Sequence, residues 1–173
     1  PRQFRPEHMG LVVNESYLRY LPVKRRSTRV VGNGTDARTA PVVDLHLLQR
    51  FGIRHKRFIL SVGRITPEKG YGMLVDAFGR LGDCDYTLVI AGGGKTDLLA
   101  EGLGDKVKLL GEVPPELMRY LYVSCACYIN ASLHEGQSNA ALEAMSFAVP
   151  VLLSDIDGNR SLGLPDRHYF PPQ

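Results

Sequence analysis

From residue 57 onward, short apolar runs rich in β-forming residues alternate with segments of helical periodicity. The predicted strands are residues 57–63, 85–94, 106–111, 126–132 and 149–155, and a further strand is expected to begin at 168–170. The predicted helices are residues 68–81, 97–104, 114–124 and 138–148. Strands that alternate with helices form parallel sheets with right-handed crossovers. The sequence therefore predicts an α/β fold, a Rossmann-like parallel sheet flanked by helices.

The first forty residues do not continue this alternation. Residues 8–21 predict a strand followed by a helix, and residues 29–36 predict a strand that ends in a Gly/Asn turn. We interpret residues 1–40 as a remnant of a preceding N-terminal domain with its interdomain linker. Residues 41–173 then form the Rossmann-like domain, which we expect to lack its final helix.

Composition narrows the class of protein. The chain has 173 residues and is 44% hydrophobic, which suits one globular domain. No apolar run approaches the roughly 18 residues of a membrane helix, and the polar first ten residues do not resemble a signal peptide. Three cysteines make no disulfide framework, so we expect reduced thiols, with Cys125 and Cys127 buried. A cytoplasmic protein is the simplest interpretation. A metal site is not expected at Cys125 and Cys127, because His134 alone adds too few ligands.

The net charge of +3 is unevenly distributed. Residues 1–50 hold nine Lys and Arg against four acids, with the densest run at Lys24–Arg29. This run is either a solvated linker or the face toward a neighbouring domain; alternatively, it attracts anionic lipid headgroups, as a peripheral membrane contact, or a phosphorylated acceptor. Nucleic acid is not predicted as a partner, because no aromatic residues or binding motif accompany the charge.

Ligands of open parallel sheets bind at the carboxyl ends of the strands. The segment Ser61–Gly70 follows such a strand: Gly63 lets a ligand approach the backbone, and Arg64 and Lys69 flank a helix start. Two cations beside a helix start suit a diphosphate. The alternative is surface charge beside an ordinary helix start.

Two further strand ends are less specific. The glycines of Ile90–Lys95, Gly93 among them, permit close packing of a nucleotide, although the spacing matches neither a Walker loop nor a Rossmann fingerprint. The segment Leu109–Met118 places Glu112 and Val113 where their backbone groups would meet a flat base. A plain turn and a structural connection are the respective alternatives.

Two glutamates, Glu135 and Glu143, have seven residues between them. Ser138 and Asn139 are good N-caps for the helix that follows, so Glu143 lies on this helix and Glu135 in the preceding loop. Eight residues of helix would separate the carboxylates by about 12 Å, too far for a shared proton. Two separate hydrogen-bonding roles on one long polar ligand fit this spacing. The alternative is one capping acid and one exposed acid.

The Glu135–Glu143 spacing resembles the E-x7-E motif of the retaining GT-B glycosyltransferases of glycosyltransferase family 4. "SVGRITPEKG" is similar to the donor-phosphate segment of that family, "VVGNGTD" to its interdomain segment, and "VPVLLSDIDGNR" to the strand and loop after its E-x7-E helix. The four segments match in order and spacing across residues 30–160. The resemblance implies that the chain is the C-terminal half of a GT-B fold.

The resemblance also implies a catalytic role for three residues. Arg64 and Lys69 would bind the diphosphate of a nucleotide-sugar, such as a UDP- or GDP-sugar, and stabilise it as it leaves. Glu135 would contact the hydroxyls of the donor sugar. Cations and helix-terminal amides can stabilise this leaving charge without a metal, so no metal or cofactor is expected.

For donor binding, the resemblance implies that Glu143 holds the ribose hydroxyls. The backbone amides of Gly136, Gln137 and Ser138 would lie over the sugar and the phosphate, and Val113 would flank the base. Many family members carry an aromatic residue and Pro or Gly where Gln137 and Ser138 stand, so the sugar is not specified by the motif.

The implied function is retaining transfer of a sugar to an unknown acceptor, a glycan or a lipid-linked saccharide. In this family the acceptor binds the first domain, so the isolated chain is expected to be inactive. Two alternatives stay open: a catalytically inactive nucleotide-binding fragment, and a nucleotide-sugar 2-epimerase of the same architecture.

Overall fold

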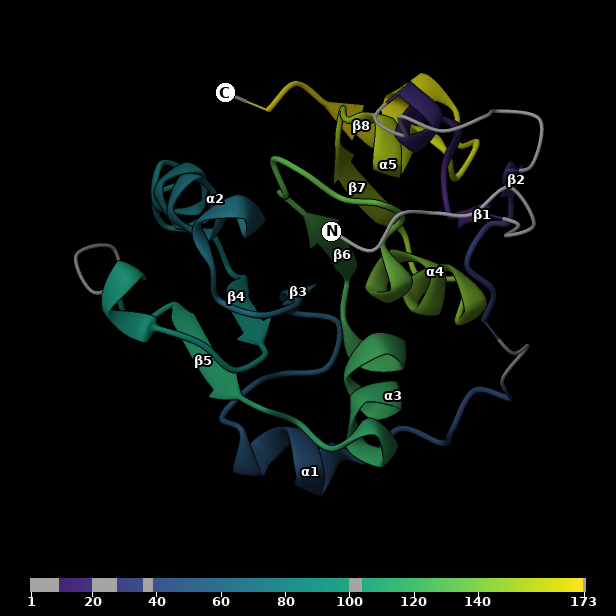
Figure 1. The fold of residues 1–173 in the computed structure, drawn as a ribbon. Helices are drawn as coiled ribbons and strands as arrows, with labels where there is room; N and C mark the ends of the chain where they lie inside the picture. The colour runs from purple at the N-terminus through teal and green to yellow at the C-terminus, as the bar shows by residue number, and fades with distance from the viewer. Residues whose placement is uncertain (1–9, 20–27, 36–38, 100–103, 173) are drawn as a thin grey trace.

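The computed structural model describes residues 10–19, 28–35, 39–99 and 104–172 (Figure 1). Its main feature is a six-stranded parallel sheet in the order β5-β4-β3-β6-β7-β8. The strands are β3 (Phe58–Val62), β4 (Thr87–Ala91), β5 (Val107–Gly111), β6 (Cys127–Asn130), β7 (Val151–Ser154) and β8 (Tyr169–Phe170). This confirms the predicted α/β fold.

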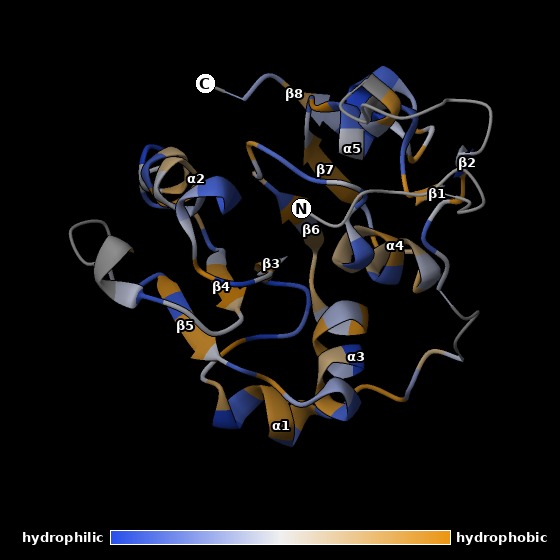
Figure 2. Ribbon diagram, viewed as in Figure 1, coloured by the Kyte–Doolittle hydropathy of each residue, from blue (hydrophilic) through white to orange (hydrophobic). Residues whose placement is uncertain are grey.

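Helices cover both faces of this sheet. One face carries α1 (Leu45–Arg50), α3 (Pro115–Ser124) and α4 (Asn139–Ser146), and the other carries α2 (Tyr71–Gly79) with the short 3₁₀ helix Thr96–Leu99. Side chains alternate along β4: Val89 packs with the first layer and Leu88 and Ile90 with the second. A strand buried on both faces is apolar throughout, and Figure 2 shows β4 and β7 as largely hydrophobic.

The order of the strands reverses between β3 and β6. The chain builds β3, β4 and β5 in one direction, and α3 then returns it to the other side of β3, where β6, β7 and β8 follow. The loops after β3 and β6 therefore diverge at neighbouring carboxyl ends. Such a switch point leaves a crevice that binds ligands in open α/β sheets.

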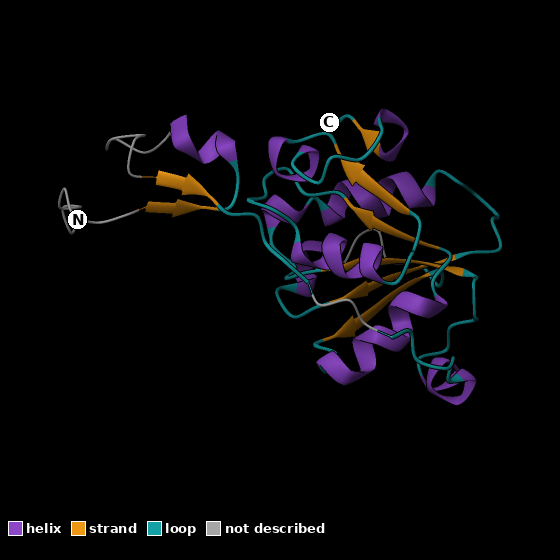
Figure 3. Ribbon diagram, turned by 90° about the vertical axis from the view of Figure 1, so that its right-hand side faces the viewer, coloured by secondary structure: helices purple, strands orange, loops and turns teal. Residues whose placement is uncertain are grey.

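A two-stranded parallel sheet lies apart from the large one, as Figure 3 shows near the N-terminus. It pairs β1 (Gly10–Val12) with β2 (Thr28–Val30), and the 3₁₀ helix Glu15–Arg19 follows β1. The strand predicted within residues 8–21 is present, but the predicted helix is a 3₁₀ helix. Residues 20–27 lie outside the described part, and so does most of the basic run Lys24–Arg29.

The continuous helix predicted for residues 68–81 is wrong. The structure has a 3₁₀ helix at Pro67–Lys69, then Gly70 with a φ of 66°, and α2 begins at Tyr71. A Cβ atom on Gly70 would lie 2.1 Å from the carbonyl oxygen of Ala131. Close contact with the loop after β6 therefore imposes a left-handed residue on the start of this helix.

Two smaller differences concern one predicted helix and one helix that was not predicted. The prediction for residues 97–104 corresponds to the 3₁₀ helix Thr96–Leu99, and residues 100–103 lie outside the described part. Helix α1 was not predicted, although its N-cap was readable: Asp44 Oδ1 accepts a hydrogen bond from the backbone N–H of Leu47 at 3.0 Å.

None of the helices in the described ranges is long and apolar enough to cross a membrane. All three cysteines are free, and Cys125 is buried as predicted, whereas Cys127 is half-buried. Burial raises the pKa of the Cys125 thiol to about 12, and burial likewise raises the pKa of Tyr71 to about 12.

These two groups predict a loss of stability at alkaline pH. Their pKa values in the folded state lie above the ordinary values of 9.0 for Cys and 10.0 for Tyr, so the unfolded chain loses these protons first as the pH rises. The two groups should not affect the free energy of unfolding below about pH 9, and each should lower it by about 1.4 kcal/mol per pH unit between its unfolded and folded pKa values.

Urea unfolding at about pH 8, 10 and 11 measures this slope. Cys125→Ala should start from a lower stability but lose less of it as the pH rises. An unchanged slope in this variant would show that the buried thiol does not contribute.

Candidate functional site

The loops after β3 and β4 meet backbone against backbone at the carboxyl edge of the sheet. The N–H of Gly63 donates to Ala91 O at 3.0 Å, and the N–H of Ile65 donates to Gly93 O at 2.7 Å. A Cβ on Gly92 would lie 2.0 Å from Gly63 O. Glycine is therefore required at Gly92 for this close approach.

Lys69 and Glu135 form an ion pair across the switch point. Lys69 Nζ lies 2.6 Å from Glu135 Oε1, and their side chains are only 22% and 12% exposed. Lys69 comes from the turn after β3 and Glu135 from the loop after β6. The N–H of Leu133 also donates to Glu68 O at 2.8 Å, so a backbone hydrogen bond holds the two loops next to each other. The structure thus brings together two of the residues predicted as catalytic.

The carboxylate of Glu135 is oriented by two further donors. Ser132 Oγ donates to Glu135 Oε1 at 2.8 Å, and Asn130 Nδ2 donates to the same oxygen at 3.3 Å. Within the described residues, every hydrogen bond of this carboxylate goes to Oε1. The other oxygen, Oε2, is consequently held in a defined direction and keeps its capacity to accept hydrogen bonds.

A buried polar network supports this arrangement, and sequence reasoning missed it. Asn159 Nδ2 donates to Asn130 Oδ1 at 3.2 Å, to Ser154 O at 2.9 Å and to Ser154 Oγ at 3.0 Å. Ser154 Oγ in turn donates to Ser132 O at 2.5 Å. The available signal was the polar residue at the end of each apolar strand, Asn130 on β6 and Ser154 on β7.

Arg64 is exposed in the turn after β3. A hydrogen bond from its own backbone, followed by the charges of Lys69 and Arg64, lowers the pKa of Glu68. Both cations therefore act on one carboxylate at this edge. Unlike Lys69, Arg64 forms no ion pair with the described residues, so its charge is not neutralised there.

The remaining strand ends are occupied by side chains of the protein itself. A Cβ on Gly93 would lie 2.6 Å from Glu112 Oε1, so the Glu112 carboxylate fills the space beside this glycine. Val113 is half-buried and packs against the core layer that includes α3. The packing of a nucleotide at Gly93 stays a prediction, and the exposed Glu112 side chain would have to move to admit it.

Glu143 lies on α4, as predicted, and away from the ion pair. Ser138 is the N-cap of this helix, and its Oγ accepts from the N–H of Ala141 at 3.3 Å. Burial, and after it the neighbouring side chains of Tyr128 and Glu143, raise the pKa of Tyr122 on α3. The half-buried Glu143 therefore faces α3, whereas Glu135 faces Lys69, and the two acids have separate surroundings.

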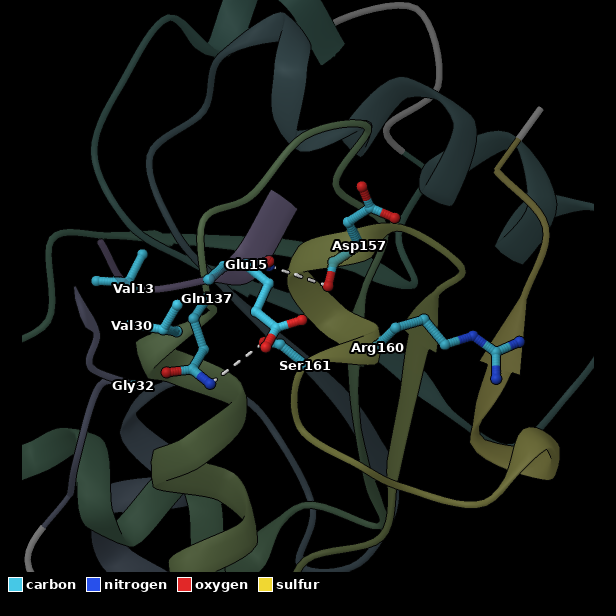
Figure 4. A pocket seen from close by; sticks show the side chains of 9 residues that line it. Val13, Glu15, Val30, Gly32, Gln137, Asp157, Arg160 and Ser161 are labelled. Carbon is cyan, nitrogen blue, oxygen red and sulfur yellow. Dashed lines mark hydrogen bonds between the residues drawn. The ribbon is translucent and has the colours of Figure 1, made fainter. Parts of the chain in front are cut away.

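Gly136 and Gln137 contact the N-terminal segment. A Cβ on Gly136 would lie 3.0 Å from Val13 Cγ2, and the side chain of Gln137 accepts from the N–H of Asn33 and donates to Ser161 Oγ at 3.2 Å. Figure 4 shows Gln137 at the wall of a cavity of about 570 Å³ between this segment and α5 (Asp157–Arg160).

The cavity offers little positive charge to a ligand. It is lined by Val13, Asn14, Glu15, Val30, Gly32, Gln137, Asp157, Arg160 and Ser161. The guanidinium of Arg160 points away from it in Figure 4 and pairs with Asp155 and Asp166. Across the described ranges, no three His, Cys, Asp or Glu side chains are grouped so that they could hold a metal ion.

The profile described as "Glycosyl transferases group 1" matches residues 56–168. O-antigen chain mannosyltransferase B of Escherichia coli is 30% identical over 127 residues, which cover 68% of this chain and 33% of that protein. N-acetylgalactosamine-N,N'-diacetylbacillosaminyl-diphospho-undecaprenol 4-alpha-N-acetylgalactosaminyltransferase of Campylobacter jejuni is 38% identical over 106 residues, 57% of this chain and 28% of that protein. The chain spans about a third of the length of these curated relatives.

Among solved structures, HepE of Anabaena in complex with UDP and glucose superposes with a TM-score of 0.82. The match covers 95% of this chain and 49% of that one, at 20% sequence identity. The likeness confirms the predicted fold class, the C-terminal half of a GT-B fold, because GT-B glycosyltransferase structures share this helix-flanked parallel sheet.

The polar network predicts that Asn159 is important for stability. Asn159→Ala removes the two N–H donors that Asn130 Oδ1 and Ser154 share, while Ser132 N–H still donates to Asn130 Oδ1 and Ile156 N–H to Ser154 O, so the free energy of unfolding should fall by about 1–3 kcal/mol. The matched control is Asn139→Ala at an exposed position in the first turn of α4, which should change it by less than about 0.5 kcal/mol. Equal effects of the two substitutions in urea unfolding would contradict a supporting role of the network.

Proposed function

Because the chain belongs to the group 1 glycosyl transferases, we propose that it binds a nucleoside-diphospho-sugar donor for a glycosyltransferase. The observation that carries this proposal is the Lys69–Glu135 pair at the switch point of the sheet, with exposed Arg64 beside it. A diphosphate needs cations, and a sugar needs an oriented carboxylate. Lys69 and Glu135 lie together at one edge of the sheet, and we propose that they serve these two needs.

We assign Lys69, Arg64 and Glu135 as the catalytic residues. When the bond between the anomeric carbon and the diphosphate oxygen breaks, negative charge develops on the departing diphosphate, and a positioned cation stabilises it. Arg64 offers its whole charge. Lys69 is already paired with Glu135, so the pair contributes position more than net charge. Glu135 Oε2 would accept hydrogen bonds from the hydroxyls of the sugar.

The other predicted binding residues keep their proposed roles. Glu143 would hold the ribose through its carboxylate on α4, and Val113 would flank the base. The backbone of Gly63 and Gly93 would border the nucleotide, and the amides of Gly136, Gln137 and Ser138 would face the phosphate and the sugar. The UDP bound to HepE, a protein of the same fold, supports a nucleoside diphosphate as the ligand.

Transfer of the sugar is proposed for the whole protein, with retention of the anomeric configuration. The names of the two relatives, one for O-antigen and one for a diphospho-undecaprenol saccharide, support a glycan or a lipid-linked saccharide as the acceptor. We further propose a cytoplasmic location, with Lys24–Arg29 as a peripheral contact to an anionic membrane. Both relatives are named as transferases, so neither the inactive fragment nor the epimerase is favoured.

Calorimetric titration with UDP, GDP, ADP and their sugars tests the proposal. One nucleoside diphosphate should bind, and its affinity should be the same in EDTA, because the unpaired charge of Arg64 and the N–H donors of Lys69 are proposed to hold the diphosphate without a metal. Absence of binding by all three would reject the proposed donor site. Loss of affinity in EDTA would instead show that a metal completes the site.

A second titration separates the two glutamates. Glu143→Gln should weaken the nucleoside diphosphate and the nucleotide-sugar equally, by about 1–3 kcal/mol, because both ligands carry the ribose. Glu135→Gln should not weaken the free nucleotide, because the substitution frees the charge of Lys69, and it should weaken the sugar-bearing donor relative to the free nucleotide. Melting temperatures of both variants serve as the folding control. The division of roles is wrong if Glu135→Gln weakens the free nucleotide as much as Glu143→Gln does.

A further inference from the structure

Two asparagines of the N-terminal segment hold the loop after β6 by its carbonyl oxygens. Asn14 Nδ2 donates to Gly136 O at 3.0 Å, and Asn33 Nδ2 donates to Gln137 O at 3.2 Å. The N–H of Asn33 also donates to Gln137 Oε1. These contacts join positions 122 and 104 residues apart. The N-terminal segment therefore forms hydrogen bonds to the carbonyl oxygens of two consecutive peptide groups, Gly136–Gln137 and Gln137–Ser138.

The hydrogen bonds of the Asn14 side chain are well shielded from water. Its side chain is only 5% exposed, and Nδ2 also donates to Asp157 O at 3.1 Å. One amide group thereby ties the loop after β6 to the start of α5. A second constraint comes from Gly158, where a Cβ would lie 2.3 Å from Glu135 O. The loop has little freedom to rotate on this side.

Because the peptide bond is planar, the hydrogen bonds to these two carbonyl oxygens also fix the direction of the N–H groups in the same peptides. In a trans peptide the C=O and the N–H point to opposite sides. The carbonyl of Gly136 shares its peptide with the N–H of Gln137, and the carbonyl of Gln137 shares its peptide with the N–H of Ser138. With both oxygens turned toward the N-terminal segment, both N–H groups must point away from it.

These two N–H groups are not used by the hydrogen bonds of the described residues, and Ser138 itself is only 4% exposed. Neither the N–H of Gln137 nor that of Ser138 has an acceptor in the described ranges. Ser138 is the N-cap of α4 and its Oγ accepts from the N–H of Ala141, which leaves the N–H groups of Asn139 and Ala140 without an intrahelical acceptor. Consecutive backbone N–H groups beside a helix start attract anionic oxygens.

We propose that Asn14 and Asn33 are positioning residues for donor binding. They fix the Gly136–Gln137 and Gln137–Ser138 peptides so that the two N–H groups face the diphosphate of the donor. This inference rests on the proposed function, since it assumes that a nucleoside diphosphate binds this edge. It adds that residues before the Rossmann-like sheet set the geometry of the anion site without touching the ligand.

The test uses Asn14→Leu and Asn33→Leu in the full chain. Leucine has nearly the shape of asparagine but donates no hydrogen bond and adds no charge. Gln49→Leu on the exposed side of α1 is the control for an amide-to-leucine change remote from this loop. The ligands are UDP, GDP or ADP, whichever the wild-type chain binds, and the matching nucleoside without phosphate.

Each asparagine variant should bind the diphosphate about tenfold more weakly, equal to about 1.4 kcal/mol, and the nucleoside unchanged. In the wild-type chain, the backbone amide resonances of Gln137 and Ser138 should shift on addition of the diphosphate, and these shifts should shrink in the variants. Gln49→Leu should match the wild type in every measurement. If Asn14→Leu does not fold, the partly exposed Asn33→Leu decides the question.

Three results would overturn the inference. Unchanged diphosphate affinity in both variants would reject the positioning role and leave the proposed function intact. Equal losses for the nucleoside and the diphosphate would show that the asparagines only stabilise the fold. A wild-type chain that binds no nucleoside diphosphate would reject the proposed function and this inference together.

Discussion

The convergence of three donors on Glu135 Oε1 is the interaction on which the candidate site depends. A half-buried ion pair is costly to desolvate unless hydrogen bonds satisfy its remaining polar atoms. Ser132 and Asn130 add two hydrogen bonds to the oxygen of Glu135 that pairs with Lys69, and the buried Asn159 orients Asn130 in turn. The carboxylate is thereby held in one direction before any ligand arrives, and such preorganisation reduces the ordering cost of binding.

The topology of the sheet explains why this pair forms. Parallel strands place their carboxyl ends at one edge, and the crossover through α3 makes β3 and β6 neighbours although they are far apart in the chain. Lys69 and Glu135 can then meet across adjacent loops. The close contact of Gly70 with Ala131 completes the approach, because any side chain at Gly70 would push the two loops apart.

The N-terminal segment has a different role from the sheet. Its own two strands make a separate pair, yet Asn14 and Asn33 reach the loop that carries Glu135. A loop at the end of a strand is the most mobile part of such a fold, and hydrogen bonds from a distant segment restrict it. Movement of this segment relative to the sheet would therefore alter the direction of the loop amides.

The sequence by itself determined the parallel α/β architecture, an N-cap at Ser138 or Asn139, and the placement of Glu135 in a loop and Glu143 on a helix. These features follow from periodicity and capping, which act over a few residues and are readable locally. Only the tertiary structure decided the interruption of the helix at Gly70, the hydrogen bond from Asn159 to Asn130 and the hydrogen bond from Asn14 to Gly136. Each of these depends on the approach of backbone or amide groups from separate elements. No local pattern records such an approach, because the residues involved are adjacent only after the sheet has assembled.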